Sequence, residues 1–154
     1  MTRDEVFFEL MESIYEVSRI TSIYESIPRK YGTDDELYMV EAHTINLIGD
    51  KIKTNTSELT QLTDKTKGAI SQMVDKLVKK GLVLKYKNPA NNREVIIELT
   101  EKGQQVYEYH KALDKMEYAK ILNRLDEFST DDFEKFIKIS SILSDITRES
   151  LKNK

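Results

Sequence analysis

Residues 66–81 follow a helical pattern, and the period of the pattern changes directly after them. Thr66 suits the N-cap of a helix because its hydroxyl can accept from an unpaired backbone N–H, and Gly81 suits the left-handed residue that ends one. β-rich residues follow at 82–87 and 95–99, separated by the turn formers 88–94. The pattern predicts a helix followed by a two-stranded hairpin with a long polar tip. The apolar face of that helix would consist of Ile70, Met73, Val74, Leu77 and Val78.

Upstream of this helix, residues 55–62 indicate a short helix that starts with capping residues, and 63–65 form a turn. Helix, turn, second helix and hairpin in this order predict a winged helix-turn-helix. The outward face of the second helix carries Lys67, Ser71 and Gln72 near its start. A cation, a hydroxyl and an amide can bond phosphates and base edges in a DNA major groove. An amphipathic surface helix is the simpler interpretation of 66–81, but it does not account for the hairpin.

The charge of this region supports the same interpretation. Residues 65–93 contain eight cations and one acid, a local net charge of +7 in a chain whose total is −3. A charge run is usually only a solvated face, but an excess this large in an acidic chain favours contact with phosphates. The acidic remainder would keep the rest of the surface away from DNA.

Several motifs of the winged region match those of a known family. The stretch 55–103 resembles the DNA-binding core of the MarR family, the multiple-antibiotic-resistance regulators, and the order of the outer helices resembles it too. One departure concerns the wing, where the family often has Asp-x-Arg and this chain has Asn91 in the acid position. The resembling motifs are Ser57-Glu58-Leu59, Thr66-Lys67-Gly68-Ala69-Ile70-Ser71-Gln72, residues 76–83, Asn91-Asn92-Arg93 and residues 99–103.

The resemblance gives each side chain of this region an expected role. Lys67, Ser71 and Gln72 would reach base edges. Thr66, Lys76 and Lys87 would hold phosphates. Arg93, at the wing tip, would enter the minor groove, where A·T tracts concentrate negative potential.

Long helices are expected on both sides of the winged region. The first would end at Ile27-Pro28, since a residue before proline is disfavoured in a helix, and Ser129-Thr130-Asp131-Asp132 resembles a capping box for the last. The terminal helices carry apolar residues on more than one face, which requires partners. The resemblance implies that they intertwine with a second subunit, although packing within one chain is the plainer alternative. The expected helices cover residues 4–27, 35–49, 100–125 and 130 onward.

The expected fold class is mainly α with a small β-hairpin wing. We expect one protomer over residues 1–154, with a winged-helix region at 35–103 and dimerisation helices within 4–34 and 104–154. In a homodimer with C2 symmetry, the two recognition helices would lie about one DNA turn apart on a pseudo-palindromic operator.

Composition excludes several other classes of protein. The chain has no cysteine, so disulfides, thiolate metal ligands and thiol-based redox sensing are excluded. The sequence contains no apolar run of membrane-spanning length and no secretory signal, so a cytoplasmic location is expected. No enzyme is expected, because the sequence has neither a Ser-His pair at plausible spacing nor a phosphate-binding glycine loop.

The two histidines of the chain, His43 and His110, are the candidate effector residues. By resemblance they flank the junction of the dimerisation and DNA-binding regions, where family members bind effectors. A zinc-sensing branch of the family uses histidines on these two helices, which implies a site of Glu25, His43, His110 and Asp114 for Zn²⁺, Ni²⁺ or Mn²⁺. Three hypotheses stay open. The first is metal binding, for which Glu41 and Glu108 are alternative ligands. The second is an organic effector that would meet Tyr24, Tyr107 and Tyr109 beside the histidines, and the third is that each histidine only forms a hydrogen bond with a neighbour.

Taken together, these patterns predict a sequence-specific double-stranded DNA-binding transcriptional regulator. It would be a homodimeric repressor controlled by a small-molecule or metal effector, which would change the spacing of the two recognition helices. The alternative is a protein-interaction module on a winged-helix scaffold without specific DNA readout.

Overall fold

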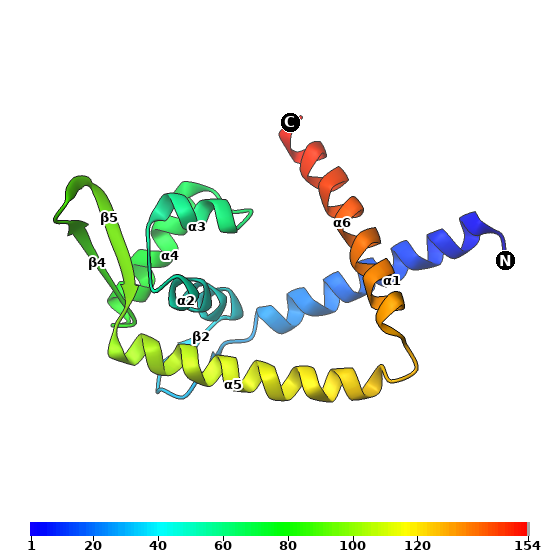
Figure 1. The fold of residues 1–154 in the computed structure, drawn as a ribbon, viewed down its shortest axis with the longest axis horizontal. Helices are drawn as coiled ribbons and strands as arrows, with labels where there is room; N and C mark the ends of the chain where they lie inside the picture. The colour runs from blue at the N-terminus through cyan, green and yellow to red at the C-terminus, as the bar shows by residue number, and fades with distance from the viewer. Residues whose placement is uncertain (154) are drawn as a thin grey trace. The chain divides into compact units, whose positions relative to one another are not determined.

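The computed structural model describes residues 1–153, which form two compact units, the first ending at Leu113 and the second beginning at Asp114. Lys154, the last residue of the expected protomer, lies outside the described residues. In chain order the elements are α1 (Arg3–Glu25), β1 (Arg29–Lys30), β2 (Glu36–Leu37), α2 (Met39–Lys51), β3 (Lys53–Thr54), α3 (Thr56–Leu62), α4 (Lys67–Lys79), β4 (Val83–Asn88), β5 (Asn91–Leu99), α5 (Glu101–Arg124) and α6 (Thr130–Lys152) (Figure 1).

The winged helix-turn-helix predicted from the sequence is confirmed. Helices α3 and α4 are followed by the β4–β5 hairpin, which projects beyond the helices of the first unit (Figure 1). Thr66 caps α4, its hydroxyl accepting from the backbone N–H of Ala69 at 3.1 Å, and Gly81 has the expected left-handed φ of 73°. The strand β3 joins the hairpin, giving an antiparallel sheet of order β3-β5-β4.

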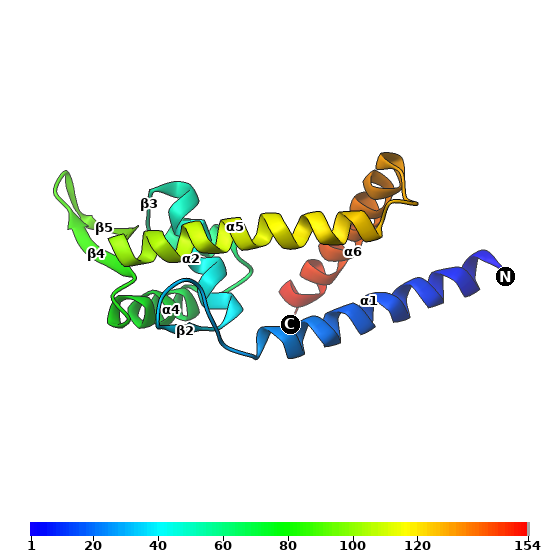
Figure 2. The ribbon, with the colours of Figure 1, turned by 90° about the horizontal axis from the view of Figure 1, so that it is seen from below.

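The core of the first unit lies between α2, α3, α4 and the sheet. The apolar stripe of α4 contributes Ile70, Val74 and Leu77, all of them buried. The first half of α5 runs beside α2 (Figure 2) and adds Val106. This packing fixes the helix-turn-helix against α2 and the start of α5. The other members of the core include Leu37, Ala42, Ile45, Ile48, Leu59, Leu82, Val83 and Ile97.

Two boundaries expected from the sequence are wrong. The second helix begins at Met39 rather than 35, because Glu36 and Leu37 pair with the earlier strand β1. The hairpin tip is shorter than the predicted 88–94, because β5 already begins at Asn91 and the strands are joined through residues 89 and 90. In both places, pairing with a strand replaced a local preference for helix or turn.

The wing meets α5 through a close backbone contact. Thr100 donates its backbone N–H to the carbonyl oxygen of Leu82 at 3.1 Å, and its hydroxyl accepts from the backbone N–H of Gly103 at 3.0 Å. Gly103 is buried against that same Leu82 carbonyl, where a Cβ would have no room. The base of the wing is thus locked to the first turn of α5.

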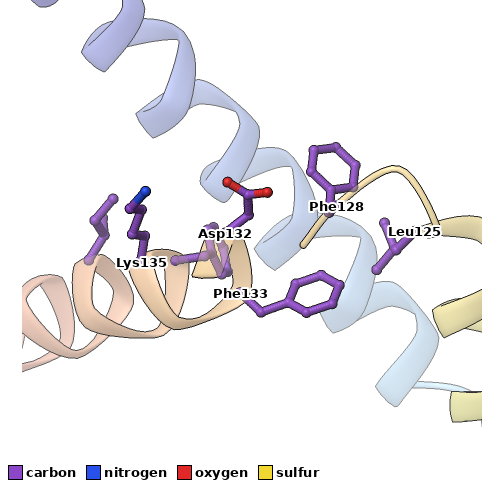
Figure 3. A pocket seen from close by; sticks show the side chains of 7 residues that line it. Leu125, Phe128, Asp132, Phe133 and Lys135 are labelled. Carbon is purple, nitrogen blue, oxygen red and sulfur yellow. The ribbon is translucent and has the colours of Figure 1, made fainter. Parts of the chain in front are cut away.

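The two terminal helices expose large apolar side chains. Neither α1 nor α6, each taken by itself, has a buried residue. In the second unit the predicted capping box is confirmed, with Ser129 accepting from the backbone N–H of Asp132 at the start of α6. Close to it, an apolar groove lies beside the α5–α6 turn, lined by Leu125, Phe128, Phe133, Phe136 and Ile139 with Asp132 and Lys135 at its edge (Figure 3).

Among residues 1–153, no helix combines the length and the apolar character needed to cross a membrane.

Candidate nucleic-acid interface

The outward face of α4 carries the three side chains predicted to reach base edges. Lys67 and Gln72 are exposed, and Ser71 is half-buried. All three lie in the first half of the helix, where the apolar stripe on the opposite face is anchored in the core. The helix therefore presents a cation, a hydroxyl and an amide from a rigid support, which direct readout of bases requires.

Of the side chains predicted to hold phosphates, Lys76 is already engaged. Its Nζ lies 3.8 Å from Oε1 of Glu41 and 5.6 Å from the centre of the Tyr38 ring, while its side chain remains 54% exposed. Thr66 keeps its hydroxyl proton available, because the hydroxyl acts as an acceptor in the helix cap. Lys87 is exposed on the wing. Lys76 can thus reach a phosphate only by loosening an ion pair.

The wing tip is organised by asparagines. Asn91, which stands where the family often has an acid, accepts from the backbone N–H of Arg93 at 3.2 Å. Asn88 accepts from the backbone N–H of Ala90 at 2.9 Å. Asn91 therefore orients the backbone of Arg93, and the exposed guanidinium remains free to turn.

Glu94 connects the wing to the helix-turn-helix. Its carboxylate accepts from the amide of Asn88 at 2.7 Å and from the amide of Asn55 at 3.2 Å. Asn55 is also the N-cap of α3, since its carbonyl oxygen accepts from the backbone N–H of Glu58 at 2.8 Å. The side chain of Asn55 thus both caps α3 and bonds Glu94 of the wing.

Sequence reasoning missed the role of Glu41, which it considered only as an alternative metal ligand. The side chain of Glu41 is fully buried, and its Oε2 lies 2.7 Å from Nζ of Lys80 at the end of α4. A signal was present, because Glu41 precedes the core residues Ile45 and Ile48 at helical spacing. A carboxylate on the apolar face of a helix needs a cation or hydrogen-bond donors.

The structure brings the two histidines together. The rings of His43 and His110 are stacked, with centroids 5.6 Å apart and planes at 14°, and Tyr31 meets the His110 ring edge-on at 5.0 Å. His43 is exposed, whereas His110 and Tyr31 are buried. Tyr31 was not predicted, since nothing in its neighbourhood in the sequence links it to a residue of α5.

The predicted metal site is not assembled around this pair. Within residues 1–153, no group of three or more His, Asp or Glu side chains is arranged to hold a metal ion. Of the alternative ligands, Glu41 faces Lys80, and Glu108 accepts from Gln104 at 3.2 Å. Two imidazoles do not fit the three or four ligands usual for zinc.

The tyrosines predicted to line an organic effector site have other partners. The guanidinium of Arg29 lies 3.6 Å from the centre of the Tyr24 ring. Tyr107 donates its hydroxyl to Oδ1 of Asp50 at 2.7 Å, near the end of α2 and about two turns beyond His43. Tyr109 packs against Gly32. The aromatic residue beside the histidines is instead Tyr31.

The contact between Tyr107 and Asp50 changes both ionisations. The hydrogen bond from Tyr107, helped by Lys111, holds the pKa of the Asp50 carboxyl below its usual value, against a smaller opposing effect of burial. The same hydrogen bond raises the pKa of the Tyr107 phenol. Both effects favour a charged acceptor and a protonated donor, so this link between α2 and α5 is maintained at neutral pH.

The chain is similar in sequence or in fold to several bacterial proteins. The model of the MarR family matches residues 37–95, which run from β2 into β5. The HTH-type transcriptional regulator PchR of Bacillus subtilis (strain 168) is 26% identical over 100 residues, which make up 65% of this chain. The match spans only 59% of the length of PchR.

Two solved structures share the fold over nearly the whole chain. FabT of Streptococcus pneumoniae, in complex with DNA, superposes with a TM-score of 0.69 at 23% identity and covers 94% of this chain and 97% of its own. The zinc-responsive MarR family member ZitR of Lactococcus lactis superposes with a TM-score of 0.65 at 16% identity, covering 90% and 99%. At identities of 23% and 16%, the similarity shows a common fold only.

Proposed function

We propose that this chain, which belongs to the MarR family, is a sequence-specific double-stranded DNA-binding transcriptional regulator that acts as a homodimeric repressor. The family consists of transcriptional regulators rather than enzymes, and PchR is named as one. A cytoplasmic location, where a regulator meets its DNA, belongs to the proposal.

The observation that carries the proposal is the exposed polar face of α4 beside an exposed basic wing. Lys67, Ser71 and Gln72 enter a major groove, while Thr66 and Lys87 hold the phosphates on either side. Arg93 reaches the adjoining minor groove from the wing tip. FabT, which has the same fold, was solved in complex with DNA, and this supports the assignment.

Dimerisation follows from the exposed apolar side chains of the outer helices. On α1, Val17 and Ile20 are 66% and 56% exposed, and on α6, Ile137 and Ile146 are 65% and 55% exposed. Repeated large apolar side chains on helices without a buried residue mark a surface that another chain covers. A second copy of this chain supplies matching helices, and the two-fold axis then sets the spacing of the two half-sites.

An effector at the junction of the dimerisation and DNA-binding regions completes the proposal. The imidazoles of His43 on α2 and His110 on α5 offer stacking surfaces and hydrogen-bonding nitrogens, and the Tyr31 ring adds an aromatic edge from the loop between β1 and β2. The stacked imidazole rings and the edge of Tyr31 suit a small planar organic molecule, and no group of three or more His, Asp or Glu side chains in the described chain is arranged to hold a metal ion. Binding there shifts the separation of the recognition helices and weakens binding to the operator.

The test is selection of fragments from random DNA, followed by measurement of affinity at increasing salt. If six to ten phosphates are neutralised, affinity should fall by roughly 10³–10⁵ between 50 and 200 mM salt. Lys87→Ala should weaken binding to all sequences and lower the salt slope by about one unit. The control Lys115→Ala removes an equal charge from α5, outside the winged region, and should change the slope less. Failure to select any sequence, or salt-independent binding, would favour a protein-interaction module.

A further inference from the structure

Glu41 is a buried carboxylate whose cationic partners both come from the recognition helix α4 and its C-cap. The side chain lies near the start of α2 and is 0% exposed. It meets Nζ of Lys80 at 2.7 Å and Nζ of Lys76 at 3.8 Å, almost forty residues later in the chain. Because a buried charge is costly unless it is paired, these contacts strongly favour one position of the end of α4 relative to α2.

Lys80 extends this attachment to the segment between α1 and α2. Its Nζ also donates to the backbone carbonyl of Glu36 at 3.1 Å, and its own carbonyl accepts from Lys102 at 3.4 Å. Lys102 in turn lies 2.5 Å from Asp35. The C-cap of α4 is thus held to the β2 segment and to the first turn of α5.

The two lysines differ in how firmly they are held. The side chain of Lys80 is 27% exposed and makes two short contacts, whereas that of Lys76 is 54% exposed and lies at the limit of an ion pair. Lys80 is therefore a structural counter-ion, while Lys76 is shared between Glu41 and the solvent. A DNA phosphate would compete with Glu41 for Lys76.

We infer that Glu41 is a positioning residue for DNA recognition: it holds α4 through Lys80 and limits how freely Lys76 contacts phosphate. The inference rests on the proposed DNA-binding function and deepens it. Glu41 touches no base, yet it favours sequence-specific over non-specific binding. It fixes the helix that reads bases, and it restrains a cation that would attract any DNA.

This inference predicts opposite effects on two kinds of DNA. Glu41→Gln should weaken binding to the selected operator, because the end of α4 loses its anchor. It should also strengthen binding to random DNA, because Lys76 is released. The ratio of the two affinities should fall about tenfold, equivalent to about 1.4 kcal/mol. The salt slope on random DNA should steepen by up to about one unit, the effect of one added phosphate contact.

The experiment measures operator and random-DNA affinity of the full-length chain from 50 to 200 mM salt. Glu108→Gln removes an equal charge from an exposed position on α5 and should leave the ratio unchanged. The double variant Glu41→Gln/Lys76→Ala should have the salt slope of Lys76→Ala alone. A general gain in positive charge would instead persist in the double variant, which would overturn the role given to Lys76.

A merely structural role for Glu41 makes a different prediction. It would lower both affinities in proportion to the folded fraction, leaving their ratio unchanged, and that result would overturn the inference. If Glu41→Gln does not fold, Lys80→Met removes the anchor of α4 from the other side while Lys76 stays beside Glu41. Operator affinity should then fall without a rise in random-DNA affinity, and an operator affinity equal to that of the unsubstituted chain would overturn the inference. Specific binding by the unsubstituted chain tests the proposed function separately, so the two failures are distinguishable.

Discussion

Replacement of Gly103 by alanine should destabilise the protein although alanine is the better helix former. Gly103 lies in the first turn of α5, where its buried Cα faces the carbonyl group of Leu82. A Cβ at this position would overlap the carbonyl oxygen of Leu82, approach its carbonyl carbon to 3.0 Å and lie 3.4 Å from Cβ of Leu99. The overlapped atom is backbone, so no side-chain rotation can relieve it.

The expected magnitude combines three effects. Overpacking of a tight site costs about 1–3 kcal/mol. Displacing the Leu82 carbonyl weakens the hydrogen bond that it accepts from Thr100, worth about 1 kcal/mol. Against these, alanine gains about 0.5–1 kcal/mol of helix propensity over glycine. The net loss is about 2 kcal/mol, which for a chain of this size lowers Tm by roughly 4–8 °C.

Gly68 provides the matched control. It lies in the first turn of α4, and a Cβ there would meet nothing within 4 Å. Gly68→Ala should therefore leave Tm unchanged or raise it slightly, because only helix propensity changes. Both variants are compared by thermal unfolding at one fixed protomer concentration, since the stability of a dimer depends on concentration. A Gly103→Ala protein as stable as Gly68→Ala would refute the argument from the Leu82 contact.

Four further predictions concern binding and stability. Gln72→Ala should cost about 1–3 kcal/mol on the selected operator and relax one position per half-site, as judged by repeated selection; an unchanged consensus would mean that the register of α4 is wrong. Deleting residues 130–154 should abolish the dimer in sedimentation, whereas a stable DNA-binding monomer would contradict the proposed assembly. Asp50→Asn should reduce the loss of unfolding free energy between pH 7 and pH 3, measured by guanidinium unfolding. The hydrogen bond from Tyr107 lowers the pKa of Asp50 in the folded state. The stability that ionised Asp50 contributes is therefore present above the ordinary carboxyl pKa and is lost as pH falls through the lowered value. An equal loss of stability in the Asp50→Asn variant and the unsubstituted protein would contradict this prediction. Zn²⁺ titration of chelator-treated protein should leave operator affinity unchanged, and a metal-dependent gain that His43→Ala abolishes would restore the metal-site hypothesis.

The parts of the fold that follow local rules could be predicted from the sequence. The α4 helix has a capping residue, an apolar stripe and a terminating glycine within one short stretch, and the capping box at Ser129 is equally local. The elements that were not predicted depend on partners far away in the sequence. Strand β3 exists because Lys53 and Thr54 pair with Glu98 and Ile97 more than forty residues away.

The same distinction applies to the candidate site. Exposed positions on α4 and the wing follow from helix and strand periodicity, so Gln72 and Arg93 could be placed from the sequence alone. The approach of His43 to His110 came from family resemblance, and the structure agrees with it. The spacing of Glu41 from Ile45 and Ile48 indicates that its side chain is buried, but its pairing with Lys80 depends on how two separate helices pack, which periodicity does not specify.

The double use of Asn55 restricts which residues can replace it. Serine and aspartate cap helices about as well as asparagine does, so the start of α3 by itself would accept any of the three. However, Asn55 also donates its amide to Glu94 on the wing. Serine is too short to span that distance, and aspartate would place a second negative charge against the carboxylate. A position that is interchangeable in an isolated helix thus becomes selective for one side chain, because the wing and the helix-turn-helix meet there.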